Sequence, residues 1–171
     1  MEPMQNPTQE TQNLLQPPAI GDSAAMFDSE DTMKDKFLTF WIGDEEYGMG
    51  IEFVTEIIGV QKITKVPDMP HFIKGVINLR GRIIPVIDVR TRFGLPERAY
   101  DERTCIVVIH VNNQTTGMIV DQVNEVSNIA QDQIESAQTG DMGGTQSYIM
   151  GIGKTGDSVK ILLHVERFMS H

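Results

Sequence analysis

The stretch GIGKTG at residues 151–156 contains residue types that could bind a phosphate group. Glycines beside a lysine and a threonine can cradle a phosphate group. The stretch lacks the earlier glycine of a phosphate-binding loop, however, and no helical pattern follows it. Because it lies between apolar runs, we predict a hairpin that turns over residues 154–157 and no nucleotide site.

The side chains that could act as nucleophiles, bases or metal ligands are scattered along the chain. The four histidines are not spaced as metal ligands, and none has a cysteine at ligand spacing: His71, His110, His164 and His171. Cys105 opens an apolar strand and is expected to be a small buried hydrophobe. The acidic pairs Glu45–Glu46 and Asp101–Glu102 are interpreted as solvated charge in polar turns. The sequence therefore predicts a protein that is not an enzyme and uses no cofactor or metal.

Length and charge narrow the possible functions further. The chain has 171 residues, 40% of them hydrophobic, which is enough for one ordinary domain with a sizeable core. The net charge of −10 argues against a general nucleic-acid binder, which needs a basic face to displace counterions from phosphates. A single cysteine excludes an internal disulfide and suits a reducing cytosol.

Residues 1–35 differ in composition from the rest of the chain. They hold seven carboxylates against one base, and they are rich in Gln, Pro and Thr. Such a segment cannot bury enough apolar surface to offset its ordering entropy, so we predict a disordered acidic tail before a domain at 36–171. It has neither the basic nor the apolar region of a signal peptide, and no run in the chain approaches the roughly 20 apolar residues that span a bilayer. We therefore expect a cytoplasmic protein without direct membrane insertion.

The elements after residue 36 are mostly short strands. KFLTFWIG, CIVVIHV and KILLHV are apolar and β-branched runs, separated by polar turns every 8–12 residues. Pro85 cannot donate to a ladder, so its strand is expected at an edge or kinked. RTRFGL is expected to form a single helical turn that Gly94 ends, and a short helix is expected at the end of the chain. The pattern predicts an all-β fold, either barrels or a sandwich, and about 136 residues fit two barrels that share an interface better than one small barrel.

Two charged residues lie inside apolar segments. Glu56 stands within FVTEIIG, and Arg80 stands within NLRG at the tip of a predicted hairpin. Partly buried charges need partners, so these two are candidates to pair with each other. Both an ordinary surface ion pair and an interface anchor fit the pattern. The apolar residues of the hairpin are expected to enter the core: Val76, Ile77, Leu79, Ile83, Ile84, Val86 and Ile87. Three further arginines, Arg82, Arg90 and Arg92, receive no role.

The long motif FIKGVINLRGRIIPVIDVR, with FLTFWIGDEEYGMGIEFVTEII, GMIVDQVNEV and YIMGIGKTGDSVKILLHVERF, resembles the CheW family of bacterial chemotaxis coupling proteins. The resemblance covers residues 37–168. It implies two SH3-like five-stranded β-barrels packed around a shared hydrophobic core, with short helical turns. It also implies a non-enzymatic adaptor that couples the cytoplasmic tips of methyl-accepting chemoreceptors to the regulatory domain of the histidine kinase CheA. Such an adaptor is recruited to receptor arrays at the inner face of the membrane.

The resemblance also implies the site residues. Glu56 and Arg80 stand at the positions of a functional ion pair. Five further residues stand at positions of a receptor-binding groove between the barrels: Val54, Gly75, Gly81, Val123 and Val126. A helical receptor tip would enter an apolar groove, and the glycines would allow a helix to approach the backbone closely. The kinase contact is not assigned to residues.

Three other identities are compatible with parts of the pattern. The chain could be the CheW-like domain of a CheA-type kinase or a CheV-like adaptor, but kinase motifs and a receiver domain are not expected from its sequence. A CheW paralogue that serves type IV pili or another chemosensory system stays open. The acidic tail is either dispensable or a weak tether to a basic partner.

Overall fold

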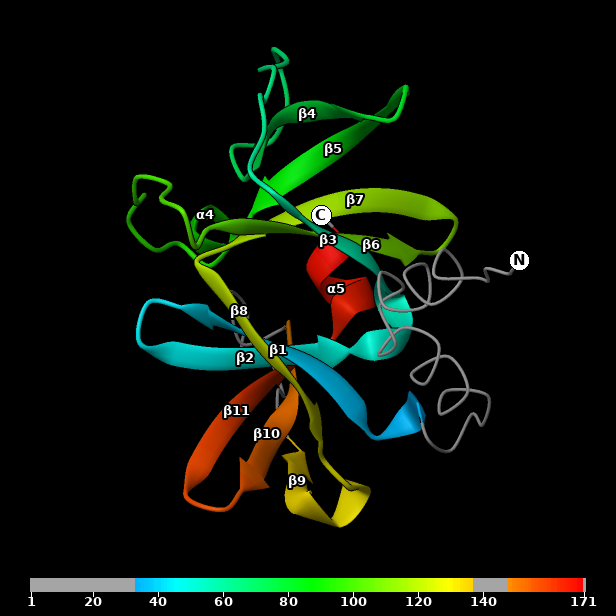
Figure 1. The fold of residues 1–171 in the computed structure, drawn as a ribbon, viewed down its shortest axis with the longest axis vertical. Coiled ribbons are helices and arrows are strands. Elements are labelled where there is room, and N and C mark those ends of the chain that lie inside the picture. The colour runs from blue at the N-terminus through cyan, green and yellow to red at the C-terminus, as the bar shows by residue number, and fades with distance from the viewer. Residues whose placement is uncertain (1–32, 137–147, 171) are drawn as a thin grey trace, which may run out of the picture. The chain divides into compact units, whose positions relative to one another are not determined.

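The computed structural model describes residues 33–136 and 148–170, and these residues form two β-sheets with short helical turns (Figure 1). The predicted disordered tail lies almost wholly outside the described residues, as does the glycine-rich loop near residue 140. The all-β class predicted from strand spacing is confirmed.

The first barrel is a sheet of six strands in the order β8-β1-β2-β11-β10-β9. Neighbouring strands are antiparallel, apart from the parallel pair of β2 and β11. The strands are β1 (Lys36–Ile42), β2 (Glu45–Gly50), β8 (Gln122–Asn128), β9 (Ile134–Ser136), β10 (Ile149–Thr155) and β11 (Ser158–Leu163). The strand count exceeds the five implied by the resemblance because the sheet includes the three-residue strand β9.

The second barrel is a sheet of five strands in the order β3-β6-β7-β5-β4. Its strands are β3 (Val54–Gly59), β4 (Ile73–Leu79), β5 (Arg82–Asp88), β6 (Cys105–Val111) and β7 (Gln114–Val120). Strands β3 and β4 stand at the two ends of the strand order, and the segment that follows β3 closes the barrel by pairing with β4. Thr64 N donates to Val76 O at 2.9 Å, and Val76 N donates to Thr64 O at 2.8 Å. Pro85 pairs with β4, whereas β5 pairs with β7 only from Val86 onward, so Pro85 lies where β5 has one partner strand.

A shared apolar core lies between the two barrels. It takes residues from both sheets, among them Phe40 and Met49 of the first barrel and Ile109 and Met118 of the second, all fully buried. A smaller cluster fills the second barrel and includes Ile77, Ile84 and Ile106. In Figure 1 the helix α5 (Val165–Met169) lies between the two sheets. Burial on both faces of β6 and β7 explains the nearly continuous apolar runs of these two central strands.

Among the described residues, three short helical turns connect strands, and a fourth follows the last strand, β11. They are η1 (Ile51–Phe53), α4 (Val89–Arg92), η2 (Gln131–Gln133) and α5. The Asp88 side chain caps α4 by accepting hydrogen bonds from Arg90 N and Thr91 N. Gly94 follows with φ of 76°, a left-handed conformation that ends the turn, as predicted.

Two expectations about burial are wrong. The β1–β2 turn consists of Gly43 and Asp44, so Glu46 lies within β2 and is buried instead of solvated. Its partner is Lys160 of β11, whose Nζ lies 3.0 Å from Glu46 Oε1. Ile83, expected in the core, is 64% exposed because it points to the outer face of β5.

Candidate functional site

The charged pair expected from the sequence is present where the two ends of the second sheet meet. We call this place, where β3 and the segment after it approach β4 and the β4–β5 turn, the seam of the second barrel. Arg80 lies in the β4–β5 turn and Glu56 lies on β3, the strand at the other end of the sheet order. Arg80 NH1 donates to Glu56 Oε2 at 2.6 Å, and NH2 donates to Oε1 at 2.8 Å. A second link crosses the same seam, where Gln61 Nε2 donates to Asn78 O at 3.2 Å. The bidentate geometry fixes the plane of the guanidinium group as well as its position.

The turn that carries Arg80 has an unusual residue at its first position. Arg80 has φ of 53° and Gly81 has φ of 85°, the signs that a two-residue type I′ hairpin turn requires. Asn or Asp is preferred at the first position, and the β6–β7 turn of this chain follows that preference with Asn112 and Asn113. Asn78 Oδ1 supports the β4–β5 turn by accepting a hydrogen bond from Gly81 N at 2.8 Å. The arginine is therefore not a residue that the turn itself favours.

Each partner stabilises the charge of the other. The hydrogen bonds from Arg80 hold the pKa of the Glu56 carboxyl below its usual value, and Glu56 raises the pKa of Arg80. The two side chains differ in exposure, since that of Arg80 is 72% exposed and that of Glu56 is 27% exposed. The glutamate thus orients a guanidinium group that is presented to solvent.

Local structure explains why glycine stands at both glycine positions of the predicted site, Gly75 and Gly81. A Cβ on Gly75 would lie 2.3 Å from the carbonyl oxygen of Thr64. Only glycine therefore lets the segment after β3, which contains Thr64, pack this closely against β4. The space beside Gly75 is therefore filled within the domain, which gives it a reason other than approach by a partner helix. Around Gly81 a Cβ would meet open space, and its positive φ accounts for the glycine.

The three valines of the predicted site lie on both barrels. Val54 begins β3, and Val123 lies on β8; both are half-buried and pack against the shared core. Val126, also on β8, is 49% exposed. The structure thus brings Glu56, Arg80 and Gly81 together at one seam, and it places the valines of β8 on the first barrel.

Two exposed apolar residues on the strands that adjoin the ion pair were not singled out from the sequence. Ile57 follows Glu56 on β3 and is 43% exposed, and the strongly exposed Ile83 lies just beyond the Arg80 turn. The alternation along β3, where every second residue is exposed, could have indicated Ile57. No comparable signal identifies Ile83, because the residues on both sides of β5 are apolar.

Within residues 33–136 and 148–170, no three His, Cys, Asp or Glu side chains are grouped so that they could hold a metal ion. Over the same residues, no helix has the length and apolar character that crossing a membrane requires.

Comparison with known proteins identifies the family. The model of the CheW-like domain matches residues 36–171. Chemotaxis protein CheW from Klebsiella aerogenes is 37% identical over 140 residues, which cover 82% of this chain and 84% of that protein. Chemotaxis protein CheW from Bacillus subtilis is 40% identical over 106 residues, or 62% of this chain and 68% of that protein.

A solved structure agrees with these matches. The crystal structure of the scaffolding protein TtCheW from Thermoanaerobacter tengcongensis has a TM-score of 0.72 and 36% sequence identity, and the match covers 80% of this chain and 88% of that one. The two-barrel fold that the sequence resemblance implied is thereby confirmed. The matching domain, the sequence identity and the fold together show that this chain belongs to the CheW family of chemotaxis scaffolding proteins.

Proposed function

We propose that this chain is a non-enzymatic cytoplasmic adaptor that couples the tips of chemoreceptors to the histidine kinase CheA. The adaptor acts by binding both partners in an array, so that receptors control the activity of the kinase. Its receptor contact comprises the Glu56–Arg80 pair, Gly81 and Val54 of the second barrel, with Val123 and Val126 of the first. Gly75 supports this contact by holding the seam beside it.

The observation that carries the proposal is the presentation of Arg80. Its backbone adopts a left-handed conformation that asparagine or glycine would occupy with less strain. Its side chain is held by two hydrogen bonds yet is 72% exposed. Arg80 thus departs from the residue preference of its turn at an exposed position, and its side chain is held in one orientation. This combination supports a binding role over a purely structural one.

Exposed apolar residues on the strands that the pair joins also support a protein partner. Ile57 and Ile83 expose 43% and 64% of their surface on the strands that flank the ion pair. Protein interfaces commonly combine an oriented arginine with an apolar surround that excludes water. A helical hairpin, with apolar side chains facing the groove and a carboxylate near Arg80, would match both features.

A reconstituted array tests the proposal. CheA, receptor-containing vesicles and this chain are combined, and we expect kinase autophosphorylation that falls when attractant is added. Arg80→Glu should reduce this control, whereas the matched control Arg82→Glu, also at an exposed arginine of the same hairpin, should leave it intact. If wild-type protein neither retained CheA on the vesicles nor supported attractant control, the proposed function would be wrong.

A charge reversal tests the pair itself. Glu56→Arg and Arg80→Glu should each impair coupling, and the double variant should recover function beyond either single variant. Simple additivity would instead mean that the two side chains act independently. Circular dichroism of each variant provides the control for folding.

A further inference from the structure

The short helix α4 lies at the junction of the two barrels and carries two arginines with separate sets of partners. It directly follows β5 of the second barrel, and its first turn is fixed by the Asp88 cap. Asp88 is itself held, because Tyr100 Oη donates to Asp88 Oδ2 at 2.8 Å. We call Arg90 and Arg92 the α4 arginines.

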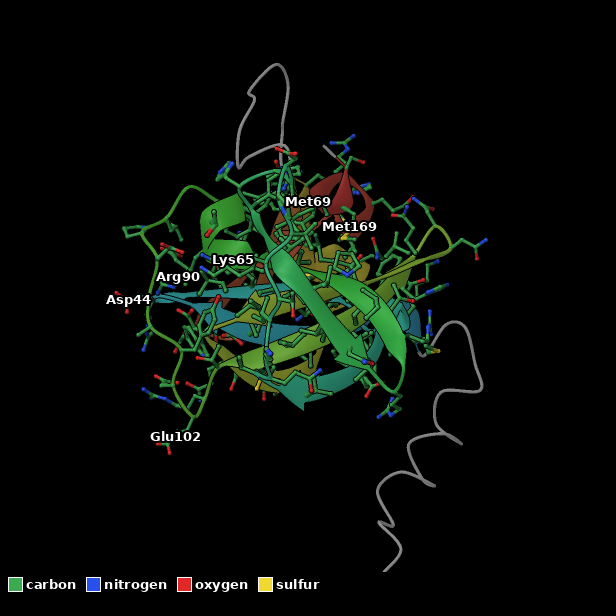
Figure 2. All side chains as sticks on the ribbon, turned by 90° about the horizontal axis from the view of Figure 1, so that it is seen from above. Asp44, Lys65, Met69, Arg90, Glu102 and Met169 are labelled. Carbon is green, nitrogen blue, oxygen red and sulfur yellow. The ribbon has the colours of Figure 1, made fainter. Side chains whose placement is uncertain are left out.

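Arg90 bonds to the chain where it passes from the second barrel to the first. Its Nε and NH2 donate to the carboxylate of Asp121, which lies between β7 and β8, at distances of 2.7–3.1 Å. Asp121 also accepts a hydrogen bond from Gly43 N, in the β1–β2 turn of the first barrel, at 2.7 Å. Figure 2 shows Arg90 on the same side of the domain as Asp44 of that turn. The side chains of Arg90 and Asp121 are 16% and 12% exposed, so water competes little for this pair.

The charge of this pair is stabilised within the domain. Burial alone would raise the pKa of Asp121, but the hydrogen bonds from Arg90 and Gly43 N hold it below the usual value. The carboxylate therefore stays ionised and paired at neutral pH.

Arg92 bonds to the opposite side of the same junction. Its guanidinium carbon lies 4.0 Å from the ring centre of Phe72, which precedes β4, and 4.6 Å from that of Tyr148, which precedes β10. Its Nε donates to Phe168 O at 3.3 Å, and its NH2 donates to Ser170 O, both at the C-terminal end of α5. In Figure 2, Met169 of α5 lies well away from Arg90. Arg92 therefore connects elements of both barrels on the α5 side.

We propose that the α4 arginines are positioning residues that hold the two barrels at one fixed orientation, which makes the adaptor a stiff connector between receptor and kinase. Burial of the apolar core shared by the barrels is a non-directional source of stability. The planar guanidinium groups add directional bonds on two sides of α4, and a rotation about that turn would break one set or the other.

The functional half of this inference rests on the proposed coupling role. A flexible adaptor would still bind receptor and kinase through surfaces that lie on the barrels, but a conformational signal from one would be lost in motion between them. Loss of Arg92 should thus separate assembly from control. The kinase should remain bound to the receptors while its response to attractant falls.

Distance measurement between the barrels tests the stiffness without reference to any partner. Spin labels are placed at Val159→Cys of the first barrel and Ile83→Cys of the second, both exposed strand positions, in a Cys105→Ser background. Pulsed electron–electron double resonance then gives the distribution of distances between the two spin labels. Arg92→Met should broaden or displace this distribution, and Arg92→Lys should do so too, because lysine lacks the planar fork. Arg103→Met is the matched control, since Arg103 is exposed and pairs with Asp101 of its own loop.

The outcomes separate the two proposals. A distribution for Arg92→Met that matches wild type would overturn the positioning role, and Arg92→Lys decides by the same criterion if Arg92→Met does not fold. A broadened distribution with CheA retained on receptor vesicles but less attractant control supports both proposals. A broadened distribution together with wild-type protein that never couples the kinase would support the positioning role and refute the proposed function.

Discussion

Replacing Lys160 with methionine should destabilise the domain by about 3–5 kcal/mol, because it leaves Glu46 charged and without its cation in the protein interior. The side chains of Lys160 and Glu46 are 4% and 6% exposed. Strand register places them side by side, since the next residues, Ile161 and Tyr47, are partners in the parallel β11–β2 pair. Asn124 Nδ2 also donates to Glu46 Oε2, at 2.7 Å.

The size of the effect follows from two opposing quantities. At 3.0 Å and an effective dielectric constant of about 20, the attraction between the charges is about 5–6 kcal/mol. Desolvation of both ions cancels much of it, so the intact pair adds little net stability. Burial alone would raise the pKa of Glu46, but hydrogen bonds from Asn124, Thr39 and Lys160 outweigh burial and hold it below its usual value. Without Lys160 its hydrogen bond and its charge are both lost, so the pKa of Glu46 rises and the charged form becomes more costly to bury.

Urea denaturation at pH 7 measures the loss, with Lys154→Met as the matched control. Lys154 pairs with Glu135 at the surface, where both side chains are more than half exposed, so its loss should cost no more than about 1 kcal/mol. The double variant Glu46→Met with Lys160→Met should recover most of the stability, because methionine restores volume without charge. A loss below about 1 kcal/mol for Lys160→Met, or a double variant as unstable as the two singles combined, would refute the reasoning.

Three further predictions concern backbone, pH and turn. Gly75→Ala should strongly lower the melting temperature, since its Cβ has no room, whereas Gly59→Ala, with nothing within 4 Å, should change it little. The folded-state pKa values of Glu46 and Asp121 lie below their ordinary values of 4.5 and 3.8. The stability that each carboxylate provides is therefore present above its ordinary pKa and is lost as pH falls through the lower folded-state pKa. A Glu46→Gln, Asp121→Asn double variant should lose less of its free energy of unfolding between pH 6 and 3, as measured by urea denaturation at each pH. Arg80→Asn should keep or raise the urea midpoint, because asparagine suits the left-handed turn, while it reduces attractant control in the reconstituted array; an intact response would contradict the binding role.

Strands, turns and one ion pair were accessible from the sequence for identifiable reasons. A strand such as KFLTFWI has β-branched and aromatic residues and is followed by a turn with Gly43, so its extent depends on local signals alone. Glu56 and Arg80 were singled out because each stands alone among apolar residues, where an unpaired charge would be costly. The pairing of strands into two barrels came from the resemblance, since spacing allowed a sandwich as well.

Features that depend on packing between segments far apart in the sequence were not accessible. Glu46 meets Lys160 across 114 positions, and no local pattern connects them. Arg90 and Arg92 were given no role from the sequence, because a four-residue helix shows no periodicity that would reveal what packs on either side. Ile83 was assigned to the core because one face of β5 fills the second barrel and the other carries apolar residues as well, which hides the alternation.

The strand order has a consequence for synthesis on the ribosome. The first barrel takes β1 and β2 from before the second barrel and β8–β11 from after it, and Thr39 of β1 meets Glu125 of β8 across 86 positions. At about 5–20 residues per second, the N-terminal hairpin waits roughly 4–17 s for the strand that covers its edge, while the whole second barrel is made. Two nascent chains on neighbouring ribosomes could exchange their β8–β11 segments during that interval. A domain-swapped dimer is therefore the assembly error to which this interleaved order is most open.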